Sequence, residues 1–90
     1  MKLKDGFSLR KVGENYYIFK NLTDKNSEVE VFSINETGVF LWKFLKNGEQ
    51  TVPSLAEFLA KEYGISIEQA LTDATTFVQS LLEIDCLNQE

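Results

Sequence analysis

The chain has 90 residues. This is enough for one small domain, because a chain of this size buries only about 60–65% of the surface that its unfolded form exposes. Its 43% apolar residues exclude a disordered chain, and no apolar run approaches the roughly 18 residues that span a bilayer. The formal net charge of −5 opposes binding to nucleic acid and anionic membranes, and suits a basic or apolar partner. We therefore expect one domain over residues 1–90, with neither nucleic acid nor membrane among its partners.

Few residues are available for chemistry. The single cysteine, Cys86, cannot form an internal disulfide, and there is no histidine to pair with a nucleophile or to bind a metal. Cys86 lies between Ile84 and Leu87 with no basic neighbour to lower its pKa, so we expect a packed thiol. The N-terminus has no apolar signal-peptide core. These features predict a cytoplasmic protein that is not an enzyme and uses no metal or cofactor.

The first third of the chain has the patterns of β-strands. Residues 7–12 alternate apolar and polar side chains, residues 16–19 are aromatic and β-branched, and residues 29–34 form a third strand-like run. Turn residues separate these runs at 13–15 and 21–27. Because the connections are short, we expect a three-stranded antiparallel meander whose second run is the central strand.

The remainder of the chain predicts three helices. The first runs from about Glu36 to Lys46, with Asn47-Gly48 as left-handed C-terminal stops. Thr51 can cap the second helix, with Pro53 in its first turn, and Gly64 ends it. Ser66 can cap the third helix, with Gln69 completing a capping box. A broad apolar stripe then follows at Ile67, Ala70, Leu71, Ala74, Phe77, Val78, Leu81 and Leu82, and the tail at residues 85–87 leaves the helix.

The order β-β-β-α-α-α predicts an α+β fold of the winged-helix-like type, a three-stranded antiparallel sheet followed by three helices. The helices must cover one face of the sheet, because three isolated strands are not stable alone. In such a meander the third strand is an edge strand with unpaired backbone N–H and C=O groups.

The most informative segment is the junction between the third strand and the first helix, Ile34-Asn35-Glu36-Thr37-Gly38. Asn35 can cap the new helix by accepting a backbone N–H bond, and Glu36 places negative charge at the positive end of the helix dipole. The helix that follows is heavily apolar, and we expect Trp42 to lie in the core.

This junction, followed by Trp42, resembles the central signature of the PqqD-like family, whose members include the peptide-binding domains called RiPP recognition elements. Three other segments resemble the family in the same order, so that the likeness covers nearly the whole chain. They are Gly6-Phe7 with Leu9-Arg10, then Thr51 to Tyr63 with Gly64-Ile65, and finally Asp73 to Leu81 with Cys86-Leu87. The family often has glycine at the position of Asp85, where this chain departs from it.

The resemblance implies a function in peptide capture. Domains of this family bind the leader segment of a ribosomally synthesised precursor peptide as an added strand on the edge of the third strand. The leader then lies in a groove between that strand and the third helix. The domain performs no chemistry itself and delivers the precursor to a maturation enzyme, often a radical SAM protein, a protease or a cyclase.

An open strand edge gives this mechanism a physical basis, because an extended peptide can pair with its free backbone groups. The strand wall of the groove would comprise Glu28, Val29, Glu30, Val31, Phe32 and Ser33. On a helical wheel, Ala70, Asp73, Phe77 and Ser80 follow one flank of the apolar stripe of the third helix, with Leu81 deeper. Glu28, Glu30 and Asp73 would favour a lysine or arginine in the leader.

Structural interpretations compete with these roles. Glu28 and Glu30 are equally suited to prevent aggregation at the edge strand, and the two roles are compatible. The spacing of Phe77 favours the core over a ligand wall. Asp73 borders the apolar stripe without an obvious helical partner, although a solvated helix aspartate is as good an interpretation.

Two other functions remain open. A winged-helix-like fold can serve a transcriptional regulator, but residues 67–84 contain no Lys or Arg to contact phosphates and carry three acidic residues. The chain can also be a small interaction module in which two third strands pair to make a homodimer. An enzyme is the least favoured class, because the sequence has no nucleophile–base pair, phosphate loop or metal cluster.

Overall fold

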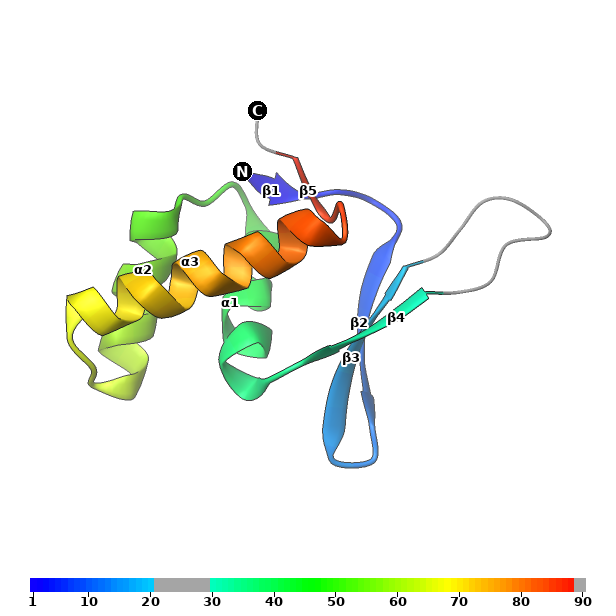
Figure 1. Cartoon of the computed structure of the whole chain (residues 1–90), viewed down its shortest axis with the longest axis horizontal. Helices are drawn as coiled ribbons and strands as arrows, with labels where there is room; N and C mark the ends of the chain where they lie inside the picture. The colour runs from blue at the N-terminus through cyan, green and yellow to red at the C-terminus, as the bar shows by residue number, and fades with distance from the viewer. Residues whose placement is uncertain (21–29, 89–90) are drawn as a thin grey trace.

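A computed structural model describes residues 1–20 and 30–88 of the chain. Its elements follow in the order β1 (Lys2–Leu3), β2 (Phe7–Val12), β3 (Asn15–Lys20), β4 (Glu30–Ile34), α1 (Glu36–Asn47), α2 (Val52–Tyr63), α3 (Ile67–Glu83) and β5 (Leu87–Asn88). This α+β order confirms the three-stranded sheet followed by three helices. Figure 1 shows α3 lying across α1 and α2, with the sheet beside α1.

The main sheet is antiparallel, with the strand order β2-β3-β4. Gly13 and Glu14 connect β2 to β3, and the φ of +65° at Gly13 is what the first position of a type II′ hairpin turn requires. The register pairs Val12 with Asn15 at the turn and continues without a break, while Ile18 in β3 pairs with Phe32 in β4. The central position of β3 is therefore confirmed, and β4 is an edge strand.

One face of this sheet packs on the helices. Ile18 is 2% exposed at the centre of the inner face, and Phe32 and Ile34 of β4 pack against the same core. Val31 belongs to the opposite face and is 48% exposed, as the two-residue period of a strand requires. The helices contribute the larger part of the core, including Trp42, which is 3% exposed as expected from the sequence.

Aromatic rings join the first two helices. Phe44 of α1 stacks on Phe58 of α2 with ring centroids 4.0 Å apart, while Phe40 meets Tyr63 edge-on at 5.7 Å. Such pairs add stabilisation beyond the burial of their area. They hold α1 and α2 together and fix the platform across which α3 lies.

Side-chain caps begin all three helices, although two details of the prediction are wrong. The reciprocal capping box lies on α2, between Thr51 and Ser54, whereas in α3 Ser66 accepts from the Gln69 N–H without a return bond. The Gln69 side chain instead bonds one turn ahead on α3. The expected left-handed stop of α1 is also absent, because Gly48 has an extended φ of 166°.

The two ends of the described chain pair in a second, two-stranded antiparallel sheet, β1 with β5, which the sequence had not indicated. The tail reaches it by a sharp reversal. Asp85 has a φ of +58°, its N–H bonds to the Leu82 carbonyl at 3.0 Å, and the Cys86 N–H bonds to the Leu81 carbonyl at 2.9 Å. This bonding is the Schellman motif with Asp85 in the left-handed position that usually takes glycine.

Within residues 1–20 and 30–88, no helix combines the length and the apolar character needed to cross a membrane.

Candidate functional site

The corner between β4 and α1 depends on a close approach that only glycine permits. The Asn35 side chain accepts the Gly38 N–H at 2.8 Å and so caps α1, as the sequence predicted. Gly38 is buried, and a Cβ added there would lie 2.6 Å from Cγ1 of Ile34. The missing side chain therefore lets Ile34, the last residue of β4, fold over the first turn of α1.

The outer edge of β4 has free backbone groups, and the register says which ones. In a two-residue hairpin the flanking pair, here Val12 and Asn15, shares both backbone hydrogen bonds. Bonding direction alternates along each strand, so Ile18 directs its groups to Phe32 of β4. The N–H and C=O groups of Val31 and Ser33 consequently point away from β3, toward the side of β4 that carries no strand in the described chain.

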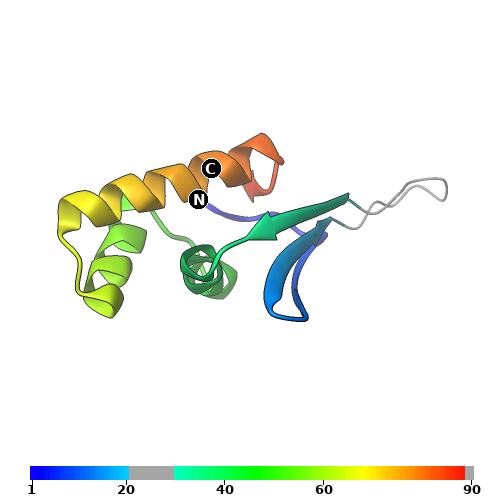
Figure 2. The same cartoon turned by 60° about the horizontal axis from the view of Figure 1, so that its bottom comes forward.

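A groove of about 660 Å³ lies along this edge, between β4 and α3. In Figure 2, β4 passes between the β2–β3 hairpin and α3. Within residues 1–20 and 30–88 no strand covers the outer edge of β4, because β5 pairs with β1. Fifteen residues from β3, β4, the corner, α1, α3 and the position after α3 line the groove: Ile18, Val31, Phe32, Ser33, Ile34, Asn35, Thr37, Gly38, Asp73, Thr76, Phe77, Ser80, Leu81, Glu83 and Ile84.

Most described residues of the predicted site lie along this groove. They are Val31, Phe32 and Ser33 from β4, and Asp73, Phe77, Ser80 and Leu81 from α3. Phe77 is 9% exposed, so it belongs to the core and also lines the groove. Leu81, at 2%, lies deeper, as expected from the helical wheel.

Four members of the predicted site lie elsewhere or outside what the structure describes. Ala70 is completely buried in the core and does not line the groove, because α3 turns that position into the apolar interior. Glu28 and Val29 lie outside the described residues. The backbone of Glu30 pairs with Lys20 at the start of β4, while its side chain is outside the described part.

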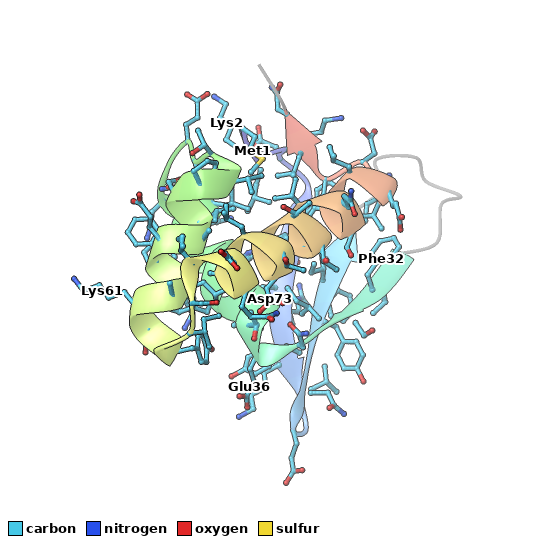
Figure 3. The ribbon with its side chains drawn as sticks, turned by 60° about the vertical axis from the view of Figure 1, so that its left-hand side comes forward. Met1, Lys2, Phe32, Glu36, Lys61 and Asp73 are labelled. Atoms are coloured by element: carbon cyan, nitrogen blue, oxygen red, sulfur yellow. The ribbon has the colours of Figure 1, made fainter. Side chains whose placement is uncertain are left out.

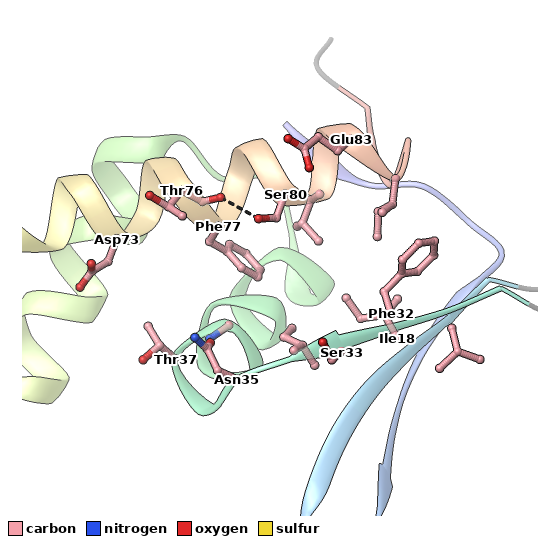
Figure 4. A pocket seen from close by; sticks show the side chains of 15 residues that line it. Ile18, Phe32, Ser33, Asn35, Thr37, Asp73, Thr76, Phe77, Ser80 and Glu83 are labelled. Atoms are coloured by element: carbon pink, nitrogen blue, oxygen red, sulfur yellow. Dashed lines mark hydrogen bonds between the residues drawn. The ribbon is translucent and has the colours of Figure 1, made fainter.

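Sequence reasoning missed several groove residues on α3 and at its end. Thr76, Glu83 and Ile84 all line the groove (Figure 4). A signal for Thr76 was present, because it lies three residues after Asp73 and four before Ser80, on the same helical flank. Ile84 follows the last helical turn, so only the reversal of the chain at Asp85 fixes where its side chain lies.

Asp73 is half-buried and, contrary to the sequence interpretation, has a helical partner. Nε2 of Gln69, one turn earlier, donates a hydrogen bond to its Oδ1 at 2.9 Å. In Figure 3, Asp73 lies on α3 at the end of the groove near Glu36 and the start of α1, while Phe32 lies toward the other end. The bond with Gln69 orients the carboxylate and leaves it acceptor capacity for a further donor.

The single cysteine of the chain, Cys86, lies outside the groove. Its thiol is fully buried, and burial raises its pKa to about 12, so the reactive thiolate is suppressed near neutral pH. In the part of the chain that the structure describes, no three Cys, Asp or Glu residues are grouped so that they could hold a metal ion.

Two comparisons with known proteins found a match, one to a family profile and one to a solved structure. The family profile described as "Coenzyme PQQ synthesis protein D (PqqD)" matches residues 25–87. The whole chain is similar in structure to a protein solved as "TbiB1 in Complex with the TbiA(beta) Leader Peptide", with a TM-score of 0.77 and 17% sequence identity over 98% of that protein. No curated protein sequence matches the chain. At 17% identity, the structural likeness establishes the fold.

Proposed function

Because the chain belongs to the PqqD family, we propose that it binds the leader segment of a ribosomally synthesised precursor peptide and presents it to a modifying enzyme. In this proposal the whole of residues 1–90 acts as one peptide-binding domain without chemistry of its own. It would act in the cytoplasm, where ribosomes release the precursor. The modifying enzyme would be a radical SAM protein, a protease or a cyclase.

The observation that carries the proposal is the free edge of β4 beside an open groove. An extended peptide that pairs with Val31 and Ser33 gains backbone hydrogen bonds, which demand little of its sequence. Its side chains alternate between two faces, so every second one enters the groove toward α3. Specificity for one leader then comes from the side chains that line the groove.

The similarity to TbiB1 supports the same interpretation, because that protein was solved in complex with a leader peptide. The regulator alternative has weaker support. The wall that α3 presents to the groove carries Asp73 and Glu83, and neither α3 nor the described groove lining contains a lysine or arginine for DNA phosphates.

The test uses the leader of a short precursor encoded beside the gene, titrated into ¹⁵N-labelled protein. We expect amide shifts along Val31–Ser33 and α3, with a dissociation constant in the nanomolar to micromolar range. Val31→Pro should weaken binding at least about fivefold, since it removes one outward N–H worth roughly 1 kcal/mol. Val31→Ala is the matched control, because it trims the same side chain and keeps the N–H.

Equal loss of affinity in the two variants would mean that the side chain, rather than the backbone edge, makes the contact. Shifts confined to surfaces away from β4 and α3 would contradict the site. Because the Val31 N–H points away from β3, the amide spectrum of Val31→Pro should remain that of a folded protein.

A further inference from the structure

The groove between β4 and α3 has two chemically different ends. Asp73, Thr37 and Asn35 lie together at the end where α1 begins (Figure 4). Phe32 and Ile18 lie at the opposite end. There Leu81 of α3 and Ile84, which directly follows α3, add two apolar side chains. A bound strand therefore meets polar side chains at one end and, at the other, apolar side chains with the exposed Glu83 carboxylate beside them on α3.

The wall that α3 contributes offers hydrogen-bond acceptors. The Thr76 hydroxyl donates its proton to the Thr72 carbonyl at 3.0 Å, and the Ser80 hydroxyl donates to the Thr76 carbonyl at 3.0 Å (dashed in Figure 4). Each hydroxyl has a single proton, so toward the groove both present only lone pairs. Asp73, one turn before Thr76 on the same flank, adds a carboxylate to this row of acceptors.

The charge of the groove has one sign. Its lining includes the carboxylates of Asp73 and Glu83 and, among the described residues, no lysine or arginine. Asp73 takes part in no ion pair within residues 1–20 and 30–88, where its partner is the neutral Gln69 side chain. A half-buried carboxylate with an incomplete set of donors favours a cationic donor over a neutral one.

We propose that the groove selects a leader segment with a lysine or arginine at the Asp73 end and an apolar side chain at the Phe32 end. This inference rests on the proposed function and specifies the leader's chemistry. The basic group donates to Asp73 and Thr76, while the apolar side chain packs between Phe32 and Ile84. A leader with an acidic residue at the first position is rejected by the Asp73 charge.

The geometry also sets the spacing of the two leader residues. Asp73 and Ile84 are eleven residues apart in sequence, which is about 16 Å along a helix and corresponds to roughly five residues of an extended strand. In an extended strand, only residues separated by an even number of positions have side chains on the same face. The expected separation is therefore four, and the long basic side chain reaches over the remaining length of about one residue. With antiparallel pairing, as in the rest of the sheet, the basic residue precedes the apolar one.

The test does not require the natural precursor. A phage-displayed library of random 12-residue peptides is selected against wild type, Asp73→Lys and Glu68→Lys. Glu68 is an exposed carboxylate of the same helix outside the groove, so its lysine variant makes the same change in net charge as Asp73→Lys. We expect wild type and Glu68→Lys to enrich Lys or Arg four positions before an apolar residue, and Asp73→Lys to replace that preference with Asp or Glu.

One enriched peptide is then titrated into purified protein. Asp73→Asn retains an oxygen that can accept from Gln69, and should weaken binding about five- to tenfold at low salt, with a smaller effect at high salt. When norleucine replaces the basic residue of the peptide, wild type and Asp73→Asn should bind the peptide with equal affinity. The inference is overturned if wild type enriches peptides that have no lysine or arginine at a fixed position, or if Asp73→Lys enriches the same motif as wild type. Either result leaves the proposed capture of a peptide intact.

Failure of the proposed function has a different signature. If wild type enriches no peptide, or if the enriched peptides bind Val31→Pro as tightly as wild type, the β4 edge is not the peptide site. That result removes the proposed function and this inference together.

Discussion

Adding one methyl group at Gly38 should disturb both the fold and the groove. A Cβ at this position would lie 2.6 Å from Cγ1 and 3.0 Å from Cδ1 of Ile34, and 3.2 Å from the Asn35 oxygen that caps α1. Cδ1 is the end of the Ile34 side chain, whereas the Asn35 oxygen is held by its hydrogen bond with the Gly38 N–H. Ile34 Cγ1 cannot give way without a rotamer change, and Ile34 itself lines the groove.

The magnitude follows from two opposing effects. Overpacking a tight site costs about 1–3 kcal/mol, whereas replacing glycine with alanine in a helix returns at most ~1 kcal/mol. The helical gain is smaller here because Gly38 lies in the first turn of α1. We expect Gly38→Ala to lower the free energy of unfolding by about 1–2 kcal/mol, a fall in Tm of roughly 5–15 °C for a domain of this size.

Gly48→Ala is the matched control. Nothing lies within 4 Å of a Cβ built on Gly48, and its φ of 166° is available to any residue. The substitution should stabilise the protein by about 0.4–1 kcal/mol by restricting the unfolded chain. Urea unfolding of wild type and both variants gives the comparison. If the Gly38→Ala protein were at least as stable as the Gly48→Ala protein, the reasoning would be refuted. If the Gly38→Ala protein bound the peptide with unchanged affinity, the position of Ile34 would not matter for peptide binding in the groove.

Two further predictions concern the tail. Lys4 Nζ bonds Asp85 Oδ1 at 2.6 Å, and this bond and the lysine charge lower the pKa of Asp85 from its ordinary value of 3.8. The contribution of the Lys4–Asp85 ion pair to the stability of the folded protein is thus complete above pH 3.8, the ordinary pKa of Asp85, and is lost as the pH falls through the lower pKa of the folded state. The stability of wild type relative to Asp85→Asn should be greater at pH 7 than in acid and should fall as the pH drops below 3.8. A difference that did not change with pH would contradict the ion pair. Cys86, with its pKa raised to about 12, should resist iodoacetamide at pH 8 until urea unfolds the protein; rapid labelling of the native state would argue against its burial.

Local chemistry made the element order predictable. Period-two alternation at residues 7–12, side-chain caps at Asn35, Thr51 and Ser66, and the left-handed Gly64 each depend on neighbours within a few residues. Such signals do not need the rest of the chain. The family resemblance used the same segments, and the profile match over residues 25–87 agrees with it.

The choice among local alternatives was less predictable. The sequence pattern predicted that the Gln69 side chain caps α3, but in the structure its Nε2 donates to Asp73 one turn ahead and no return bond to the Ser66 backbone forms. Asp85 occupies the left-handed position usual for glycine, and its carboxylate meets Lys4, 81 residues away along the chain. A partner at that separation is outside any local pattern.

The sequence alone therefore determined the order of the three strands of the main sheet and of the three helices, the edge position of β4 and the apolar stripe of α3. Only the tertiary structure decided which flank of that stripe borders β4, placing Ala70 in the core and Thr76 and Ile84 at the groove. It also decided that β5 pairs with β1, so that no other strand of the described residues lies on the outer edge of β4. The physical reason is that periodicity identifies the apolar side of a helix or strand, whereas the neighbour that covers each side is fixed by contacts between distant segments.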